Sequence, residues 1–433
     1  MNKKITVFWF RRDLRLHDNV GFYNALKSKN PVLPIFIFDK DILDKLKKDD
    51  SRVSYIHQEL QNIKAELLKI KRGISIFYGK PIDIYKQLSE IYEIDVVNTN
   101  HDYEPYANQR DAEIKAFLTS KNINFNTFKD QVIFEKNEIL KKDGNPYKVY
   151  TPYSRKWLEA FQEKGIQFYP SEKYLENCIC IEKHPFLTLS DIGFTKSNIT
   201  SEPYNVSTRL INEYEETRNF PAQNATSKLG AHLRFGAVSV RQMVDKASKS
   251  SNITFLKELI WREFFMQILW HFPHTQKKAF KPKYDRILWR NDEADFKAWC
   301  NGQTGYPLVD AGMRELNKTG FMHNRVRMLV GSFLCKHLLI DWRWGEAYFA
   351  EKLLDYEMSS NVGNWQWVAG SGVDASPYFR IFNPTTQIKK FDKDLEYIKK
   401  WVPEFQELTY SKEIIEHKFA RERCLKVYKE AVS

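Results

Sequence analysis

Short apolar runs and segments of helical periodicity alternate over the first 130 residues. The runs are rich in Ile, Val and Phe and cover residues 5–10, 32–39, 74–78 and 95–99. Such runs are typical of strands buried in a parallel sheet. Between them, residues 53–70 repeat aliphatic side chains at spacings of three and four, as one face of a helix does. The alternation predicts an α/β domain with a doubly wound parallel sheet over residues 1–130.

Beyond about residue 204 the pattern changes to successive segments of helical periodicity, and strand-like runs nearly vanish. The expected helices cover residues 207–217, 228–247, 253–271, 292–301, 308–318, 322–340 and 344–357. Residues 131–203 contain turn-forming and Pro-, Ser- and Thr-containing stretches with a short helix at 154–163. The sequence therefore predicts an interdomain connector over 131–203 and an all-helical domain over 204–433.

The balance of charge favours a polyanionic partner. The 433 residues include 67 basic and 55 acidic side chains, which gives a net charge of +12 and a pI near 9.1. Such a balance is common in proteins that bind nucleic acid. The chain has no apolar stretch of about 20 residues, so no membrane partner is expected. The histidines and five cysteines lack metal-ligand spacing, so we expect no metal site and reduced thiols in a cytoplasmic protein.

One stretch of the chain concentrates basic residues. Its cations are Lys277, Lys278, Lys281, Lys283, Arg286 and Arg290, and only Asp285 opposes them. Two interpretations stay open for this run. It is either a solvated surface or part of a face that binds an anionic partner.

Tryptophan is concentrated in the second half of the chain. Nine of the eleven tryptophans lie at or after position 261, and residues 361–367 read NVGNWQW. Trp342 and Trp344 repeat the spacing of Trp365 and Trp367. A buried indole needs a partner for its N–H group. The company of asparagines and acids suggests a site for an aromatic cofactor or for electron transfer, rather than core alone.

Charged side chains interrupt an aromatic helical stripe in the segment 253–271. Glu258, Trp261, Arg262 and Phe265 share one face at spacings of three, four and seven. An acid and an arginine are rarely buried unless they are paired. The stripe is either a partly exposed helix with an internal Glu258–Arg262 ion pair, or the wall of a cavity with an acid for hydrogen bonding and an indole for stacking.

Two further clusters stand at expected helix starts. Thr226 and Ser227 precede an apolar helix, where hydroxyls serve as N-caps or help to bind phosphate. Arg325 and Arg327 follow His323 at another start, where arginines oppose the helix dipole and favour an anionic partner such as Asp355. His323 alone is more often structural.

Taken together, these segments resemble the DNA photolyase/cryptochrome family along essentially the whole chain. The resemblance lies in four motifs: FWFRRDLRLHDN at 8–19, TGYPLVDAGMR at 304–314, NVGNWQW at 361–367 and ASPYFRIFNP at 375–384. The nearest branch resembles the class I cyclobutane pyrimidine dimer photolyases. The family implies an N-terminal α/β antenna domain, a helical domain that holds FAD, and DNA containing pyrimidine dimers as the partner of a monomeric enzyme. Its reaction passes an electron from light-excited, reduced FAD to the dimer, which splits.

The resemblance also implies roles for individual residues. FAD would be held by Tyr214, Thr226, Ser227, Lys228, Leu229, Gly230, Arg262, Arg327, Asp355, Tyr356, Glu357 and Asn361. Arg327 would pair with Asp355, and the neutral amide of Asn361 would face flavin N5. Electrons would reach the flavin through Trp289, Trp342 and Trp365. The catalytic lesion pocket would comprise Glu258, Trp261, Asn324, Met328, Asn361 and Trp367. The DNA would be bound by Glu258, Trp261, Arg325 and Arg380.

Other members of the family define the alternatives. A (6-4) photolyase uses paired histidines at the lesion, and Met322-His323 lacks that pair. A cryptochrome photoreceptor often replaces the asparagine at the flavin, and Asn361 is kept. Residues 101–106 with Arg110 and Asp111 resemble the edge of the antenna cleft. We expect a folate or a deazaflavin as the antenna pigment, and its identity stays open.

Overall fold

The computed structural model describes residues 4–180 and 186–433, which form two compact units. The first unit comprises Met1–Glu135, Ala160–Glu202 and Leu229–Lys249. The second comprises Lys136–Glu159, Pro203–Lys228 and Ser250–Ser433. Residues 1–3 and 181–185 of the expected ranges lie outside the described residues. Within the described part, no helix is both long and apolar enough to cross a bilayer.

A five-stranded, fully parallel sheet forms the centre of the first unit, with the order β3-β2-β1-β4-β5. Its strands are β1 (Ile5–Phe10), β2 (Val32–Asp39), β3 (Ser75–Gly79), β4 (Ile94–Asn100) and β5 (Asn124–Phe128). Register is continuous between β1 and β2, where Thr6 lies opposite Val32 and Phe10 opposite Phe36. The order confirms the doubly wound parallel sheet expected from the sequence.

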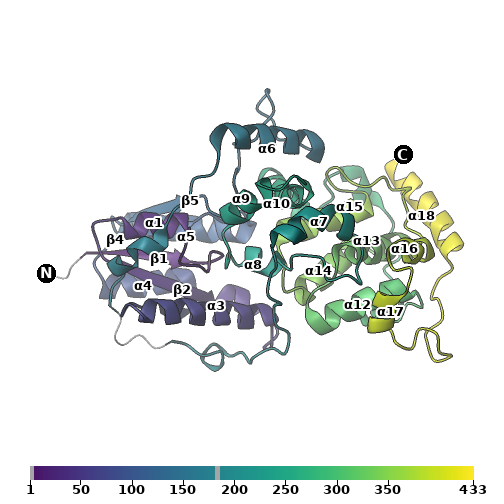
Figure 1. The fold of residues 1–433 in the computed structure, drawn as a ribbon, viewed down its shortest axis with the longest axis horizontal. Coiled ribbons are helices and arrows are strands. Elements are labelled where there is room, and N and C mark those ends of the chain that lie inside the picture. Colours follow the sequence, from purple (N-terminus) through teal and green to yellow (C-terminus); the bar gives the residue numbers. More distant parts are fainter. Residues whose placement is uncertain (1–3, 181–185) are drawn as a thin grey trace. The chain divides into compact units, whose positions relative to one another are not determined.

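Helices cover both faces of this sheet (Figure 1). They are α1 (Val20–Leu26), α2 (Lys40–Leu43), α3 (Ser51–Leu68), α4 (Pro81–Ile91) and α5 (Pro105–Ser120). Val7 and Trp9 pack with side chains of α4 and α5. Phe8 and Phe10 contact Phe22 of α1, with ring centres 5.0 and 5.1 Å apart. Successive residues of β1 therefore face opposite helical layers, which explains why that strand is apolar throughout.

Two short helices that follow in the sequence also belong to the first unit. They are α8 (Gly230–Arg234) and α9 (Val240–Ser248). Buried ion pairs tie α9 to the α/β part, because Arg241 binds Asp18 at 2.9 Å and Asp130 at 2.8 Å. One helix was expected over 228–247, and that prediction is wrong. Gly236 breaks it with a φ of +65°, and a side chain there would lie 2.1 Å from the carbonyl oxygen of Arg12.

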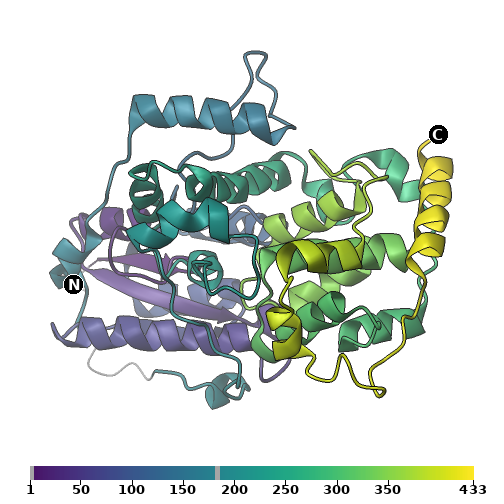
Figure 2. The same cartoon turned by 45° about the vertical axis from the view of Figure 1, so that its right-hand side comes forward.

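The expected connector is divided between the units and contains α6 (Tyr150–Lys164) and the 3-10 turns η1 (Ser171–Asn177) and η2 (Ser190–Ile192). The other elements of the second unit are α7 (Thr208–Thr217), α10 (Thr254–His271), η3 (Pro273–Gln276), η4 (Pro282–Arg286), α11 (Glu293–Asn301), α12 (Pro307–Thr319), α13 (Asn324–Ser332), a π-helical segment η5 (Phe333–His337), α14 (Trp342–Lys352), α15 (Met358–Ala369), α16 (Pro384–Phe391), α17 (Glu396–Trp401) and α18 (His417–Val432). Figure 2 shows this helical part from a second side, with α18 in yellow.

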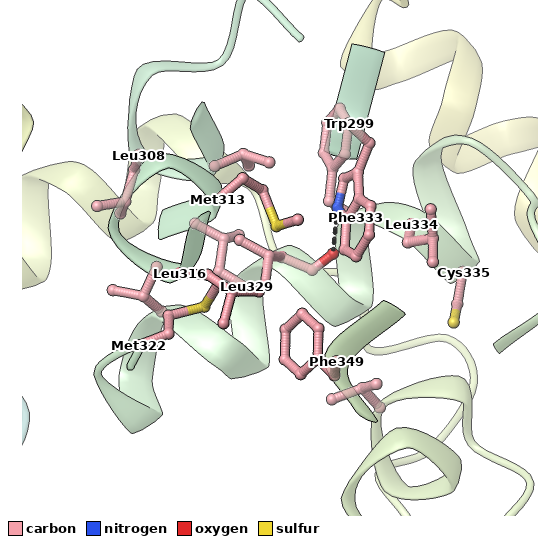
Figure 3. Close-up of a cluster of buried hydrophobic side chains, with 14 of the residues drawn as sticks. Trp299, Leu308, Met313, Leu316, Met322, Leu329, Phe333, Leu334, Cys335 and Phe349 are labelled. Carbon is pink, nitrogen blue, oxygen red and sulfur yellow. Dashed lines mark hydrogen bonds between the residues drawn. The ribbon is translucent and has the colours of Figure 1, made fainter. Parts of the chain in front are cut away.

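Helix boundaries in the second unit differ from the expected ones at two places. The segment 322–340 is α13 continued by the π-helical turn, and the segment 344–357 ends its helix at Lys352. The tryptophan-rich segment 361–367, which had no assigned element, lies within α15. A large apolar core joins α11 to α15 (Figure 3). In it the Trp299 indole N–H donates to the carbonyl of Val330 at 3.1 Å.

Candidate functional site

A cavity in the second unit lies between α13 and α15. Eight of the expected site residues line it: Asn324, Arg327, Met328, Asp355, Tyr356, Glu357, Asn361 and Trp365. They come from three stretches of the chain, namely α13, the link between α14 and α15, and α15 itself. The fold therefore brings together residues that are up to 41 positions apart in the sequence (324 to 365).

An ion pair fixes one wall of the cavity. The Arg327 guanidinium donates to Asp355 at 2.9 Å and to the carbonyl of Met322 at 2.7 Å. The expected pairing of Arg327 with Asp355 is thus present. His323 precedes them as the N-cap of α13, where its Nδ1 accepts from the Arg325 amide at 3.2 Å. Burial and nearby cations lower the pKa of His323 to about 4, so it is neutral at pH 7, as a structural cap requires.

The same wall offers an acceptor that no protein group uses. The second carboxylate oxygen of Asp355 is buried and has no hydrogen-bond partner among the described residues. Buried polar atoms are rarely left in that state, because each such group costs about 1–3 kcal/mol. The cavity therefore fits a ligand that presents an N–H donor to Asp355, as the isoalloxazine ring of FAD can.

Asn361 is oriented by a residue that the sequence did not single out. Its amide nitrogen donates to the Glu346 side chain at 2.9 Å and to the Glu346 carbonyl at 3.1 Å. Both amide hydrogens are thereby held on the α14 side, so the amide oxygen is the part left to act as an acceptor. Burial raises the pKa of Glu346, and the hydrogen bond from Asn361 opposes that rise.

The three expected electron carriers lie at different depths. Trp342 and Trp365 are buried, and Trp289 is partly buried. Trp365 packs edge-on against Phe349, with ring centres 5.0 Å apart, and against Trp299 at 6.2 Å. Trp289 meets Tyr428 edge-on at 5.9 Å. Their role in electron transfer stays a prediction.

The stripe on α10 has partners from distant parts of the chain. Trp261 stacks on Tyr150, with ring centres 3.6 Å apart and planes 7° from parallel. Glu258 forms an ion pair with Arg218, which ends α7. Burial raises the pKa of Glu258, and the charge of Arg218 opposes that rise. Helical periodicity could reveal neither Tyr150 nor Arg218, because both partners are tertiary.

The expected phosphate-binding segment has an irregular backbone. Helix α8 begins at Gly230 with Leu229 as its N-cap and without a side-chain cap, so the prediction that Thr226 and Ser227 cap a helix is wrong. Lys228 has a φ of +55°, a conformation that non-glycine residues rarely adopt and that is found at ligand-binding sites. Its ammonium lies 3.6 Å from the ring centre of Phe321.

The remaining expected residues lie outside this cavity. Tyr214 is on α7, Arg262 is half-buried on α10, Trp367 is half-buried on α15, and Arg380 is exposed after α15. The guanidinium of Arg325 lies 4.4 Å from the ring centre of Phe391 and donates to Asn219. Glu357 caps α15 by accepting from the Ser360 amide at 2.9 Å. The assignment of these residues to FAD or to DNA stays a prediction.

Comparison with known proteins agrees with this geometry. A family model described as DNA photolyase matches residues 6–171, and one described as the FAD binding domain of DNA photolyase matches residues 255–421. A deoxyribodipyrimidine photo-lyase of Agrobacterium fabrum is 36% identical over 98% of this chain and 97% of its own length.

Solved structures give the same result. A bacterial class III photolyase from Agrobacterium tumefaciens has a TM-score of 0.85 and 33% identity over 100% of this chain and 98% of its own. An archaeal photolyase from Sulfolobus tokodaii, solved with two FAD molecules, has a TM-score of 0.82 and 30% identity over 98% of this chain and 99% of its own. The chain belongs to the DNA photolyase family.

Proposed function

We propose that this chain is a deoxyribodipyrimidine photo-lyase that splits cyclobutane pyrimidine dimers in DNA in a light-dependent reaction with reduced FAD. The observation that carries the proposal is the cavity that joins Arg327, Asp355 and Asn361 in a chain with this ancestry. When bound, FAD supplies the chemistry, which is the transfer of one electron to the dimer after absorption of blue or near-UV light and its later return.

The residues around the cavity hold and tune the cofactor. Asp355 accepts a hydrogen bond from the ring, and Arg327 both orients that carboxylate and cancels its charge. Asn361 presents a neutral acceptor, because Glu346 holds its amide hydrogens. A neutral group at this place avoids repulsion of an anionic reduced ring. The segment 226–230 and Tyr214 bind the phosphates.

The lesion pocket is built on α10, α13 and α15. Base flipping, of which photolyases are a known example, brings the damaged pair out of the helix at a cost of a few kcal/mol. Trp261, held flat by Tyr150, and Trp367 stack against the flipped dimer, while Glu258 hydrogen-bonds its carbonyls. Asn324 and Met328 complete the pocket, and Arg325 and Arg380 bind flanking phosphates.

Finer aspects of the proposal concern the first unit and the cell. The first unit carries the antenna pigment, a folate or a deazaflavin, and an absorption band beyond the flavin envelope of the purified protein would identify it. We place the enzyme in the cytoplasm as a monomer. All five cysteines are free thiols, which fits a reducing compartment. Light scattering of the purified protein tests the monomer.

The test is repair of a single-stranded oligonucleotide that carries one thymine dimer. We expect the dimer to disappear under blue light and to persist in the dark. A variant with Glu258→Ala and Trp261→Ala should retain FAD and lose repair, while the exposed Glu430→Ala control repairs like the parent. A protein that takes up FAD yet leaves the dimer intact in light would overturn the proposal.

A further inference from the structure

A basic segment, residues 277–286, carries five cations and a single acid. The cations are Lys277, Lys278, Lys281, Lys283 and Arg286, and all except the half-buried Lys281 are exposed. The acid, Asp285, is already neutralised by Arg343 of α14, which binds it at 2.5 Å. The basic segment therefore presents positive charge that its own carboxylate does not cancel.

This segment is held rigidly by the one residue between the two tryptophans of α15. Gln366 is 2% exposed. Its amide nitrogen donates to the carbonyls of Thr275 at 2.8 Å and Lys278 at 3.0 Å, and its amide oxygen accepts from Phe280 at 2.8 Å. Three buried hydrogen bonds from a single side chain fix the position of the basic segment relative to α15.

The same residue anchors the stretch that leads to Arg380. The backbone oxygen of Gln366 accepts from Ser371 and from Gly372, each at 3.0 Å. Lys281 binds this stretch twice, through its amide to the carbonyl of Ser371 at 2.9 Å and through its ammonium to the carbonyl of Gly370 at 3.3 Å. The basic segment, α15 and residues 370–372 are thus joined by one set of hydrogen bonds.

We propose that the basic segment is a further phosphate-binding element, which grips the DNA backbone beside the pyrimidine dimer. This inference rests on the proposed function. A run of lysines that served only solubility would not require a buried amide to hold its backbone in place. The anchoring keeps these cations at a fixed distance from Trp367, so that DNA bound through them is in register with the lesion pocket.

Counterion release gives the inference a measurable size. Each phosphate contact adds about 0.9 to the slope of log affinity against log salt concentration on duplex DNA. Replacing both Lys277 and Lys278 by alanine should lower that slope by about 1.8. The affinity that the parent gains between 1 M and 0.1 M salt should fall by roughly 60-fold, or about 8-fold for each contact.

The experiment measures binding of the FAD-loaded, full-length protein to a dimer-containing duplex and to its undamaged counterpart over a range of salt concentrations. The Lys277→Arg/Lys278→Arg protein should keep the parental slope, because both charges remain. The control replaces the exposed Lys297 and Lys412 by alanine and should also keep it.

The outcomes separate this inference from the proposed function. A Lys277→Ala/Lys278→Ala protein that still prefers damaged DNA and keeps the parental slope overturns the inference alone, and the charges are then merely solvated. A parent that binds damaged and undamaged duplexes equally overturns the proposed function, and the inference with it. An equal loss of slope in the Lys297→Ala/Lys412→Ala control also overturns the inference, because the effect would then be one of net charge.

Discussion

Gly345 of α14 offers the sharpest test of how the core positions Trp365. A methyl group at this position would lie 2.1 and 2.4 Å from two ring carbons of Trp365 and 2.6 Å from a methyl of Leu334. Carbon atoms pack at about 3.5–4.0 Å, so the indole must move by roughly 1.4 Å or more in Gly345→Ala. The ring cannot move freely, because it is 3% exposed.

The expected loss of stability follows from this crowding. Overpacking a close-packed core costs about 1–3 kcal/mol, and we expect the upper end because the ring is enclosed. Alanine returns up to about 1 kcal/mol through its better helix propensity. The net loss is about 2 kcal/mol, which corresponds to a Tm about 4–8 °C lower for a folding unit of 150–250 residues.

Thermal unfolding and photoreduction of the FAD-loaded protein provide the assay. Gly345→Ala should unfold earlier and reduce its flavin more slowly in light, because Trp365 is the expected first electron donor. Gly331→Ala is the matched control, since its methyl would lie 3.6 Å from the same ring and 3.0 Å from Val368. If Gly345→Ala matched the control in both measurements, the position of Trp365 described here would be wrong.

Three further predictions concern the site. Glu346→Ala frees the Asn361 amide and should speed reoxidation of reduced FAD in air, whereas Glu346→Gln keeps an acceptor and should behave like the parent. Arg218→Ala removes the charge that opposes the raised pKa of Glu258, so the infrared C=O band of its protonated carboxyl should persist to higher pH. A raised carboxyl pKa leaves more protons on the folded state than on the unfolded chain, so stability falls as pH rises through this window, and Glu258→Gln should flatten that dependence. Trp342→Phe should slow photoreduction of bound FAD, because a phenyl ring is harder to oxidise than an indole.

The elements that the sequence predicted correctly are those whose packing is uniform along their length. Strands β1 and β2 are buried on both faces and therefore appear as continuous apolar runs. Strand β5 was missed because it is an edge strand, and its polar NFNTF sequence lies mostly toward solvent. The helix expected over 228–247 was interrupted by Gly236, whose backbone conformation depends on contact with Arg12. Periodicity does not contain such contacts.

The site follows the same rule. The ion pair of Arg327 with Asp355 could be anticipated from a resemblance to known proteins, since 28 positions separate its members. The partners of Trp261, Glu258 and Asn361 come from α6, α7 and α14, and neither spacing nor composition identifies them. A side chain that positions another one leaves a weak signal in a single sequence, because its residue type is also common on ordinary helices.

The spacing of the tryptophans in α15 has a different meaning from the one it suggests in the sequence. Residues two apart on a helix point about 200° away from each other, so Trp365 and Trp367 do not form a pair. Trp365 lies with Asn361 on the cavity side, four residues away, while Gln366 faces the basic segment. A single helix thus serves three directions: the cofactor cavity, the half-buried face of Trp367, and the anchored cations. A substitution at any one of these positions should therefore affect one function without the others, which is the behaviour that distinguishes a scaffold helix from a cluster of stacked indoles.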